Sequence, residues 1–337
     1  MRLKSFIFSP LFAHTRGTTG WILGRHRSNS RLPPWQRPTS ARLDDFSLSA
    51  SSSSTTSTTY DTTIYNPRLV ILIPAYNEEG RIELTLKSYQ DFLLRSLSND
   101  IKSEIVIVDD GSSDATLDVI NNFSSEIPIY TVVMKENKGK GAAIARGVQH
   151  ISQKMYESFA DDDDDKDTWI LTQDADGSGD LIYLENMMNK LGTLIQPATP
   201  STSDMTSRQG LVIGNRKYDI FSSRGITRWG FQTCVRILTS NRLRVNDSQC
   251  GYKLMTLDTA KVLYKNLHLE GWSHDVEVLF RAMLLNIPID ETNIEWEDME
   301  GSKVTEAGIV KVSLQMLWDV IRLRWNYSVV RNWTLSS

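Results

Sequence analysis

Residues 69–78 read LVILIPAYNE, an apolar run of mostly branched side chains that ends abruptly in polar ones. Two similar stretches follow, IVIVDDGS at 105–112 and WILTQDADG at 169–177. Continuous branched apolar runs are typical of strands that are buried on both faces of a parallel sheet. Each stretch therefore predicts a buried strand whose carboxyl end carries polar side chains.

Helical patterns separate these strands. Helices are expected at about 79–97, from Asp114 through Ile120, and at 139–151, and two further strands at 129–134 and 211–213. A helix is expected directly after Asp180, and three more at about 227–243, 275–285 and 310–325. Alternation of strands and helices predicts an α/β fold, with a Rossmann-like, mostly parallel sheet, flanking helices and right-handed crossovers.

The start of the chain differs in composition from the rest. Up to Arg42 there are eight Lys or Arg and no acidic residue, and residues 47–59 are almost entirely Ser and Thr. Such a segment buries too little apolar surface to offset its ordering entropy. We expect a disordered leader at 1–66, a catalytic domain at 67–327 and a tail at 328–337. The basic, acid-poor start also fits an organelle transit peptide.

Composition sets limits on function. The net charge is -4, so nothing in the overall charge points to nucleic acid as a partner. The two cysteines, Cys234 and Cys250, are too few for a disulfide framework and favour a reducing compartment. No run of about 18 apolar residues is present, so the sequence predicts no transmembrane helix.

The pair Asp174 and Asp176 is the sharpest chemical feature. The two carboxylates lie two positions apart at a strand end, where both can turn toward one ion. Mg²⁺ and Mn²⁺ prefer such oxygen ligands together with substrate phosphates. Ligands bind at the carboxyl ends of strands in open α/β sheets, and two other predicted strands end in acidic residues there as well. We therefore expect a divalent metal held by both carboxylates.

Several motifs resemble the family 2 glycosyltransferases of the GT-A fold: PAYNE (74–78), VDDGSSDAT (108–116), NKGKGAAIARG (137–147) and QDADG (173–177). Three later segments are similar to the eukaryotic dolichyl-phosphate β-glucosyltransferase branch: NDSQCGYKL (246–254), EGWSHDVEVL (270–279) and IEWEDMEGSKV (294–304). The resemblance covers about 69–326, with the motifs in order.

The resemblance implies a nucleotide-diphospho-sugar transferase that moves glucose from UDP-glucose to dolichyl phosphate, for protein N-glycosylation, on the cytosolic face of the endoplasmic reticulum. A single displacement would invert the anomeric centre and give a β-linked product. Asp174 and Asp176 would hold Mg²⁺ or Mn²⁺, which neutralises charge on the departing UDP. The implied nucleotide-sugar site comprises Pro74, Ala75, Tyr76, Glu78, Asp109, Asp110, Lys138, Gly139, Lys140, Asp174 and Ala175.

The candidate catalytic residues are Asp176, Asp247 and Arg216. Arg216 is expected to contact the acceptor phosphate, and Asp247 to act as a supporting acid. A lipid monophosphate is already an anion at neutral pH, because its second pKa is about 6, so a general base is unnecessary. We interpret His274 as structural or interfacial, because adjacent residues on a helix, here His274 and Asp275, do not face each other. The C-terminal stretch that contains Trp318 and Arg322 has the composition of a helix that lies in a bilayer interface.

The chain departs from this branch at its start, where the basic arm replaces the expected hydrophobic anchor. Attachment to the membrane would then depend on amphipathic helices or on an anchoring partner. Three alternatives stay open: transfer of mannose from GDP-mannose, a polyprenyl-phosphate enzyme, and an inactive nucleotide-binding scaffold. A dinucleotide oxidoreductase is disfavoured, because no Gly-x-Gly-x-x-Gly turn follows the first strand.

Overall fold

The structure is a computed structural model, and it describes residues 67–97, 101–158, 167–195, 208–217, 223–239, 243, 245–296, 306–330 and 333. The predicted leader at 1–66, and any targeting signal within it, lies outside the described residues.

The described residues form one seven-stranded sheet in the order β3-β2-β1-β4-β6-β5-β7. The strands are β1 (Arg68–Ala75), β2 (Ser103–Asp109), β3 (Ile129–Val133), β4 (Thr168–Thr172), β5 (Leu211–Arg216), β6 (Lys253–Thr256) and β7 (Ile289–Ile294). Strands β1 to β4 pair in parallel, as do β5 and β7, while β6 runs antiparallel between β4 and β5. This mostly parallel sheet confirms the predicted fold class.

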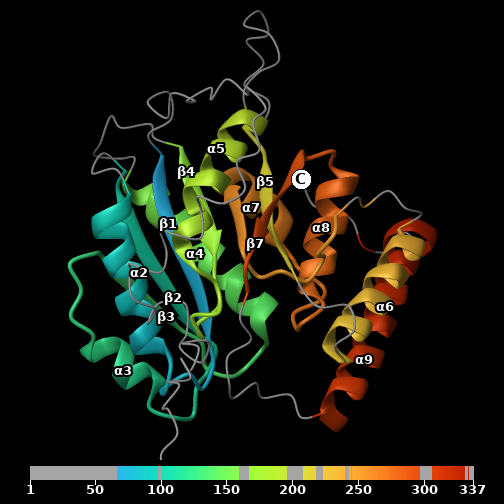
Figure 1. Cartoon of the computed structure of the whole chain (residues 1–337), viewed down its shortest axis with the longest axis horizontal. Coiled ribbons are helices and arrows are strands. Elements are labelled where there is room, and N and C mark those ends of the chain that lie inside the picture. The colour runs from blue at the N-terminus through green and yellow to red at the C-terminus, as the bar shows by residue number, and fades with distance from the viewer. Residues whose placement is uncertain are drawn as a thin grey trace, which may run out of the picture. The chain divides into compact units, whose positions relative to one another are not determined.

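Helices cover both faces of the sheet (Figure 1). They are α2 (Ile82–Ser96), α3 (Thr116–Asn122), α4 (Lys140–Ser158), α5 (Leu184–Ile195), α6 (Ser223–Leu238), α7 (Leu257–Tyr264), α8 (His274–Leu284) and α9 (Glu306–Arg324). A 3₁₀ turn, η3 (Leu181–Tyr183), precedes α5, and a π-helical segment, η4 (Trp325–Val330), continues α9.

The pattern of β1 shows why both faces are covered. Val70 and Leu72 pack in one core with α4, α7 and α8, whereas Leu69, Ile71 and Ile73 pack in another with α2, α3 and α5. Successive side chains of a strand point to opposite faces, so an apolar residue at every position needs a helical layer on each side.

Helices α6 and α9 contact each other and lie side by side at one end of the described structure (Figure 1). Val320 of α9 reaches the core on the side of α4 and α8, while Leu323 and Tyr327 join Leu269 and Phe280 in a small separate cluster. The π-helical segment extends past the expected boundary at 327, and Trp333 stacks on His268 with ring centroids 4.2 Å apart.

All five strands read from the sequence are present, whereas β6, β7 and α7 were not predicted. Strand β6 has four residues, and β7 reads IDETNI, in which apolar residues do not alternate. Among the described helices, none combines the length and apolar content that a membrane span requires.

Candidate active site

The carboxyl ends of β1, β2 and β4 lie next to one another, because these strands are neighbours in the sheet. Ala75 at the end of β1 is in register with Asp109 at the end of β2. The N–H of Asp110 donates to the carbonyl of Ala75 at 2.8 Å, and the N–H of Gln173 donates to that of Leu72 at 3.0 Å. The three predicted polar strand ends therefore form one edge.

The turn after β1 is tied to the loop after β2. Asn77 has a left-handed backbone (φ 53°), and its N–H donates to the Ser112 hydroxyl at 2.9 Å. The Ser113 N–H donates to the side-chain oxygen of Asn77 at 2.8 Å. The N–H of Glu78 donates to the Thr116 hydroxyl at 2.7 Å. These bonds order the expected nucleotide loop, along which Pro74 is partly buried and Tyr76 is exposed.

Asp110 joins this edge to the turn before α4. Its two carboxylate oxygens accept from the N–H groups of Lys138 (2.9 Å) and Gly139 (2.8 Å). Burial raises the pKa of Asp110, and the two backbone hydrogen bonds oppose that rise. Asp109 is buried beside it and accepts weakly from the N–H of Ser112, at 3.3 Å.

The start of α4 is closed against the loop before α8. Gly139 has φ 102°, and a Cβ there would lie 2.7 Å from the carbonyl oxygen of Glu270, so only glycine fits. That carbonyl accepts from the N–H groups of Gly141 (2.8 Å) and Ala142 (3.2 Å). The N–H groups of Lys138, Gly139 and Gly141 are thus paired within the chain, and the side chain of Lys140 reaches the site.

The two expected metal ligands have different surroundings. Asp174 forms an ion pair with the ammonium of Lys140, and their side chains are 26% and 16% exposed. Asp176 accepts from the hydroxyl (2.6 Å) and the N–H (3.0 Å) of Ser178, and its side chain is 28% exposed. Arg81 lies 3.9 Å from Asp176 and also pairs with Glu78 at 2.6 Å.

Each carboxylate thus has a cationic side chain beside it. Ala175, between them, is buried and its carbonyl accepts from the Thr85 hydroxyl at 2.9 Å, so the peptide that links the carboxylates is anchored to α2.

Lys140 belongs to a row of alternating charges. Burial opposes its charge, but the carboxylates of Asp174 and Asp275 outweigh burial and raise its pKa. Asp275 is buried and pairs with the ammonium of Lys253, which also donates to the carbonyl of Cys250. Burial alone would raise the pKa of Asp275, but the neighbouring His274 and Lys253 hold it below its usual range.

His274 and Asp275 correct one step of the sequence interpretation. Adjacent helical residues were expected to point apart, yet Nε2 of His274 lies 3.1 Å from a carboxylate oxygen of Asp275. His274 opens α8, where its Nδ1 also lies 2.8 Å from the carbonyl of Gly271. The His274 side chain is fully buried. It packs against the start of α4, where a Cβ on Gly141 would lie 2.5 Å from Cβ of His274.

Gly251 forms the wall behind the Lys140–Asp174 pair. A Cβ at this position would lie 2.8 Å from Nζ of Lys140 and 3.1 Å from the nearer carboxylate oxygen of Asp174. The Gly251 carbonyl accepts from the Thr172 hydroxyl at 2.7 Å, which holds the loop against the end of β4. A side chain at this position would therefore require Nζ of Lys140 to shift.

Arg216 and Asp247 form a bidentate ion pair at the end of β5. Nε and Nη2 of Arg216 lie 2.5 and 2.9 Å from the two carboxylate oxygens, and the side chain of Asp247 is 1% exposed. Burial opposes the charge on Arg216, but Cys250, Asp247 and Asp174 raise its pKa above the usual value. In this geometry Asp247 accepts hydrogen bonds and orients the guanidinium, so the structure favours an orienting role over proton donation.

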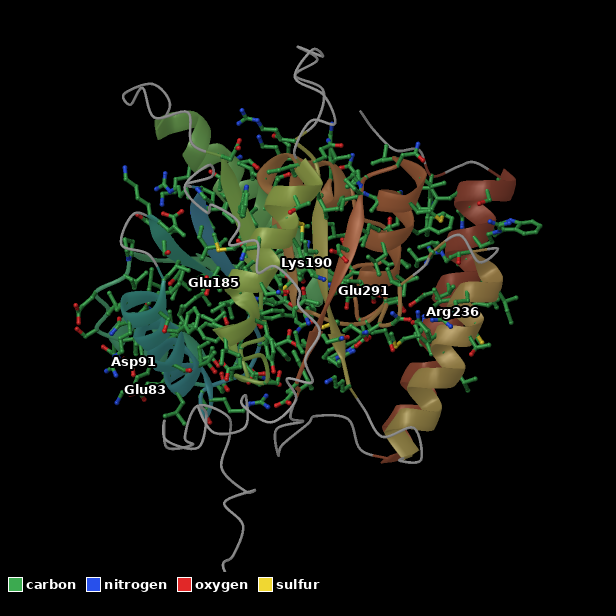
Figure 2. The ribbon with its side chains drawn as sticks, turned by 45° about the horizontal axis from the view of Figure 1, so that its top comes forward. Glu83, Asp91, Glu185, Lys190, Arg236 and Glu291 are labelled. Atoms are coloured by element: carbon green, nitrogen blue, oxygen red, sulfur yellow. The ribbon has the colours of Figure 1, made fainter. Side chains whose placement is uncertain are left out.

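The loop that carries Asp247 is braced from two sides. Asn246 donates to both carboxylate oxygens of Glu291 on β7 at 2.7 Å, and it accepts from Arg236 on α6 at 3.3 Å. Figure 2 shows Glu291 on its strand beside Lys190 of α5, and Arg236 on α6. Lys190 donates to the carbonyl of Glu291 and so joins α5 to the same brace.

Sequence reasoning missed four residues of this site, namely Arg81, Gly251, Lys253 and Asp275. Gly251 and Lys253 lie within NDSQCGYKL, and Asp275 within EGWSHDVEVL, so the motifs marked their segments without indicating their roles. Among the described residues, no group of three or more His, Cys, Asp or Glu side chains is arranged as a metal site. Any cation at Asp174 and Asp176 therefore needs further oxygen ligands from substrate or water.

The model of glycosyl transferase family 2 matches residues 70–239. Those residues include the strand ends described above and the Asp174–Asp176 pair. The chain belongs to this family.

Within the family, the chain is similar to curated dolichyl-phosphate beta-glucosyltransferases. It is 32% identical to the protein of Dictyostelium discoideum over 280 residues, which cover 78% of this chain and 76% of the relative. Identity to the protein of Saccharomyces cerevisiae is 31% over 273 residues (77% and 75%), and to that of Homo sapiens 30% over 270 residues (77% and 76%).

Among solved structures, the chain is similar to glucosyl-3-phosphoglycerate synthase from Mycobacterium tuberculosis, in complex with Mn²⁺, uridine diphosphate and glucosyl-3-phosphoglycerate. The TM-score is 0.51 at 16% identity, over 77% of this chain and 79% of that one. At this identity the likeness establishes the fold and leaves the substrates of this chain to its own residues.

Proposed function

We propose that the chain transfers glucose from UDP-glucose to dolichyl phosphate with inversion, at the cytosolic face of the endoplasmic reticulum membrane. The observation that carries the proposal is the strand-end edge itself, where Asp174 and Asp176 meet Lys140 and Arg81. Similarity to dolichyl-phosphate beta-glucosyltransferases over three quarters of the chain supports the choice of donor and acceptor.

The donor would lie along the ends of β1, β2 and β4. The ordered turn from Pro74 to Glu78 would border the nucleoside, next to Asp109, while Asp110 holds the Lys138–Gly139 turn in place. Lys140 would then face the diphosphate, since its ammonium already lies against the first carboxylate of the pair. Preorganised positive charge is most useful where negative charge develops on a departing diphosphate.

Asp174 and Asp176 fit a hard divalent cation. Both are partly exposed carboxylates, and each has a cationic side chain near it, which supports a role for positive charge at this edge. These two residues would hold Mg²⁺ or Mn²⁺ with donor oxygens, and the ion would neutralise charge on the leaving UDP. A glycosyltransferase of the same fold contains Mn²⁺ together with UDP, so the fold accommodates the combination.

The acceptor phosphate would bind Arg216, whose guanidinium Asp247 orients. Arg216 is near enough to Asp174 for the charge of that carboxylate to raise its pKa. A phosphate monoester needs no base to become a nucleophile at neutral pH, because its second pKa is about 6. The chain would therefore act mainly by positioning the acceptor in line with the anomeric carbon.

The test is transfer of radiolabelled glucose from UDP-glucose to detergent-dispersed dolichyl phosphate with Mg²⁺ or Mn²⁺, beside GDP-mannose as donor. We expect labelling from UDP-glucose that EDTA stops. Asp176→Asn should lower transfer by roughly 10²-fold or more, with an unchanged circular dichroism spectrum. Labelling from GDP-mannose alone would replace the donor, and full activity of the Asp176→Asn variant would remove the metal site.

A further inference from the structure

Helix α9, together with its continuation η4, is apolar on two opposite faces. Its inner face consists of Met316, Val320, Leu323 and Tyr327, which are all buried. Its opposite face is an outward stripe of four exposed residues: Leu314 (62%), Trp318 (62%), Ile321 (40%) and Trp325 (57%). Both sets follow spacings of four, three and four positions, which places each set on one helix face.

The outward stripe is unusual for this molecule. Among the side chains that the structure describes on the other helices, no helix exposes more than two large apolar ones, the maximum being Leu84 and Leu94 of α2. Single exposed apolar residues are ordinary, but a contiguous aromatic stripe marks an interaction surface.

Helix α9 contacts the loop that carries Asp247 and the loop before His274. The Gln249 amide donates to Sδ of Met316 at 3.5 Å, and the same residue donates its N–H to Asp247. Ser273, the residue before His274, donates its hydroxyl to Asp319 at 2.7 Å. Whatever binds the outward stripe therefore lies about one helix diameter, roughly 10 Å, from the loops of the site.

The charges beside the stripe indicate what binds it. Arg322 and Arg324 follow Ile321 at the next and third-next positions, so they flank the stripe on its two sides. The only acidic residue between 314 and 330 is Asp319, which is bonded to Ser273 and Gln315. A second copy of this face would bring arginine against arginine with no carboxylate between them, whereas lipid phosphates would pair with both.

We propose that the outward stripe seats the catalytic domain on an anionic lipid bilayer, with Trp318 and Trp325 in the interface and both arginines at the headgroups. The inference rests on the proposed function for its purpose, because a lipid-linked acceptor has to reach Arg216 from a membrane. α9 would thus hold the acceptor side of the site at the bilayer surface.

Flotation of the full chain with vesicles that contain neither donor nor acceptor tests the seat. We expect flotation with phosphatidylcholine vesicles that contain phosphatidylserine, and much less without phosphatidylserine. A Trp318→Ser/Trp325→Ser variant should bind the vesicles at least about tenfold more weakly than the parent. Arg322→Gln/Arg324→Gln should lose about fivefold per arginine on anionic vesicles. The matched control, Leu84→Ser/Leu94→Ser in α2, should bind like the parent.

Equal flotation of the parent and the tryptophan variant would overturn the proposal, as would an equal loss in the α2 control. Lipid-free self-association that the tryptophan changes abolish would assign the stripe to a second copy, and would also overturn it. Transfer to a short-chain polyprenyl phosphate in detergent separates the two proposals. Transfer activity that the tryptophan variant keeps in detergent supports a membrane contact that is separate from catalysis. If the parent floats with vesicles but transfers no glucose, the proposed function alone is refuted.

Discussion

The Lys140–Asp174 ion pair leads to a prediction with an unusual sign. Lys140→Met removes the ammonium and keeps an unbranched side chain of similar length. In the nucleotide-free protein, the lysine and a divalent cation would compete for the same carboxylate, because Nζ of Lys140 already lies against Asp174. The variant should therefore bind Mn²⁺ more tightly than the parent when no nucleotide is present.

The exposure of the pair sets the magnitude. Two unit charges about 4 Å apart interact by about 4 kcal/mol at an effective dielectric constant near 20, whereas exposed pairs contribute less than about 1 kcal/mol. The Lys140 and Asp174 side chains are 16% and 26% exposed, so the pair lies between these limits. A value of about 2 kcal/mol corresponds to a roughly 30-fold lower Kd for Mn²⁺.

Titration of Mn²⁺ into the nucleotide-free proteins, followed by electron paramagnetic resonance, measures this difference. Lys138→Met is the matched control, because Lys138 is half exposed and its Nζ lies 3.7 Å from Glu136, away from Asp174. With UDP present the order should reverse, since the variant lacks the charge proposed to face the diphosphate. Unchanged or weaker Mn²⁺ binding by the Lys140→Met variant without nucleotide would refute the competition.

Three further outcomes are expected. Gly251→Ala should reduce transfer at least about tenfold, because a Cβ would displace the Lys140–Asp174 ion pair beside it. The control Gly271→Ala, whose added Cβ would have no atom within 4 Å, should stay active. Equal losses of transfer in both variants would contradict this prediction. Arg216→Lys cannot keep both bonds to buried Asp247 and should lower the free energy of unfolding by about 1–3 kcal/mol in urea titrations, where no change would disprove the bidentate role. Burial raises the pKa of Cys250 to about 11. An unfolded thiol titrates at about 8.5, so its contribution to stability is intact below that pH and is lost as the pH rises. Between pH 8 and 10, Cys250→Ala should lose about 2 kcal/mol less stability than the parent, and parallel curves would refute this.

The sequence interpretation was accurate for features that depend on neighbouring residues and failed for those that depend on distant ones. Strands β1, β2 and β4 were predicted because each has a branched apolar run that ends in polar residues. β6 and β7 were missed, because a strand of four residues and one without alternation have no local signature. The neighbours of each strand depend on pairing across the sheet, which a single sequence does not display.

The same limit applied to His274. Its position beside Asp275 on a helix suggested side chains that point apart, which holds for the body of a helix. At the first turn of α8 the imidazole turns back and meets the carboxylate at 3.1 Å. Lys253, the buried partner of Asp275, lies 22 positions before it in the chain, so local spacing could not indicate this pair.

The sequence by itself determined the α/β class, the acidic strand ends and the family, because these depend on short runs of residues and on their order along the chain. Only the tertiary structure decided which cation meets which carboxylate: Lys140 with Asp174, Lys253 with Asp275 and Arg216 with Asp247. It also decided that α9 presents a second apolar face outward. Pairings between distant segments follow from how strands and helices pack, and no local pattern of residues encodes that packing.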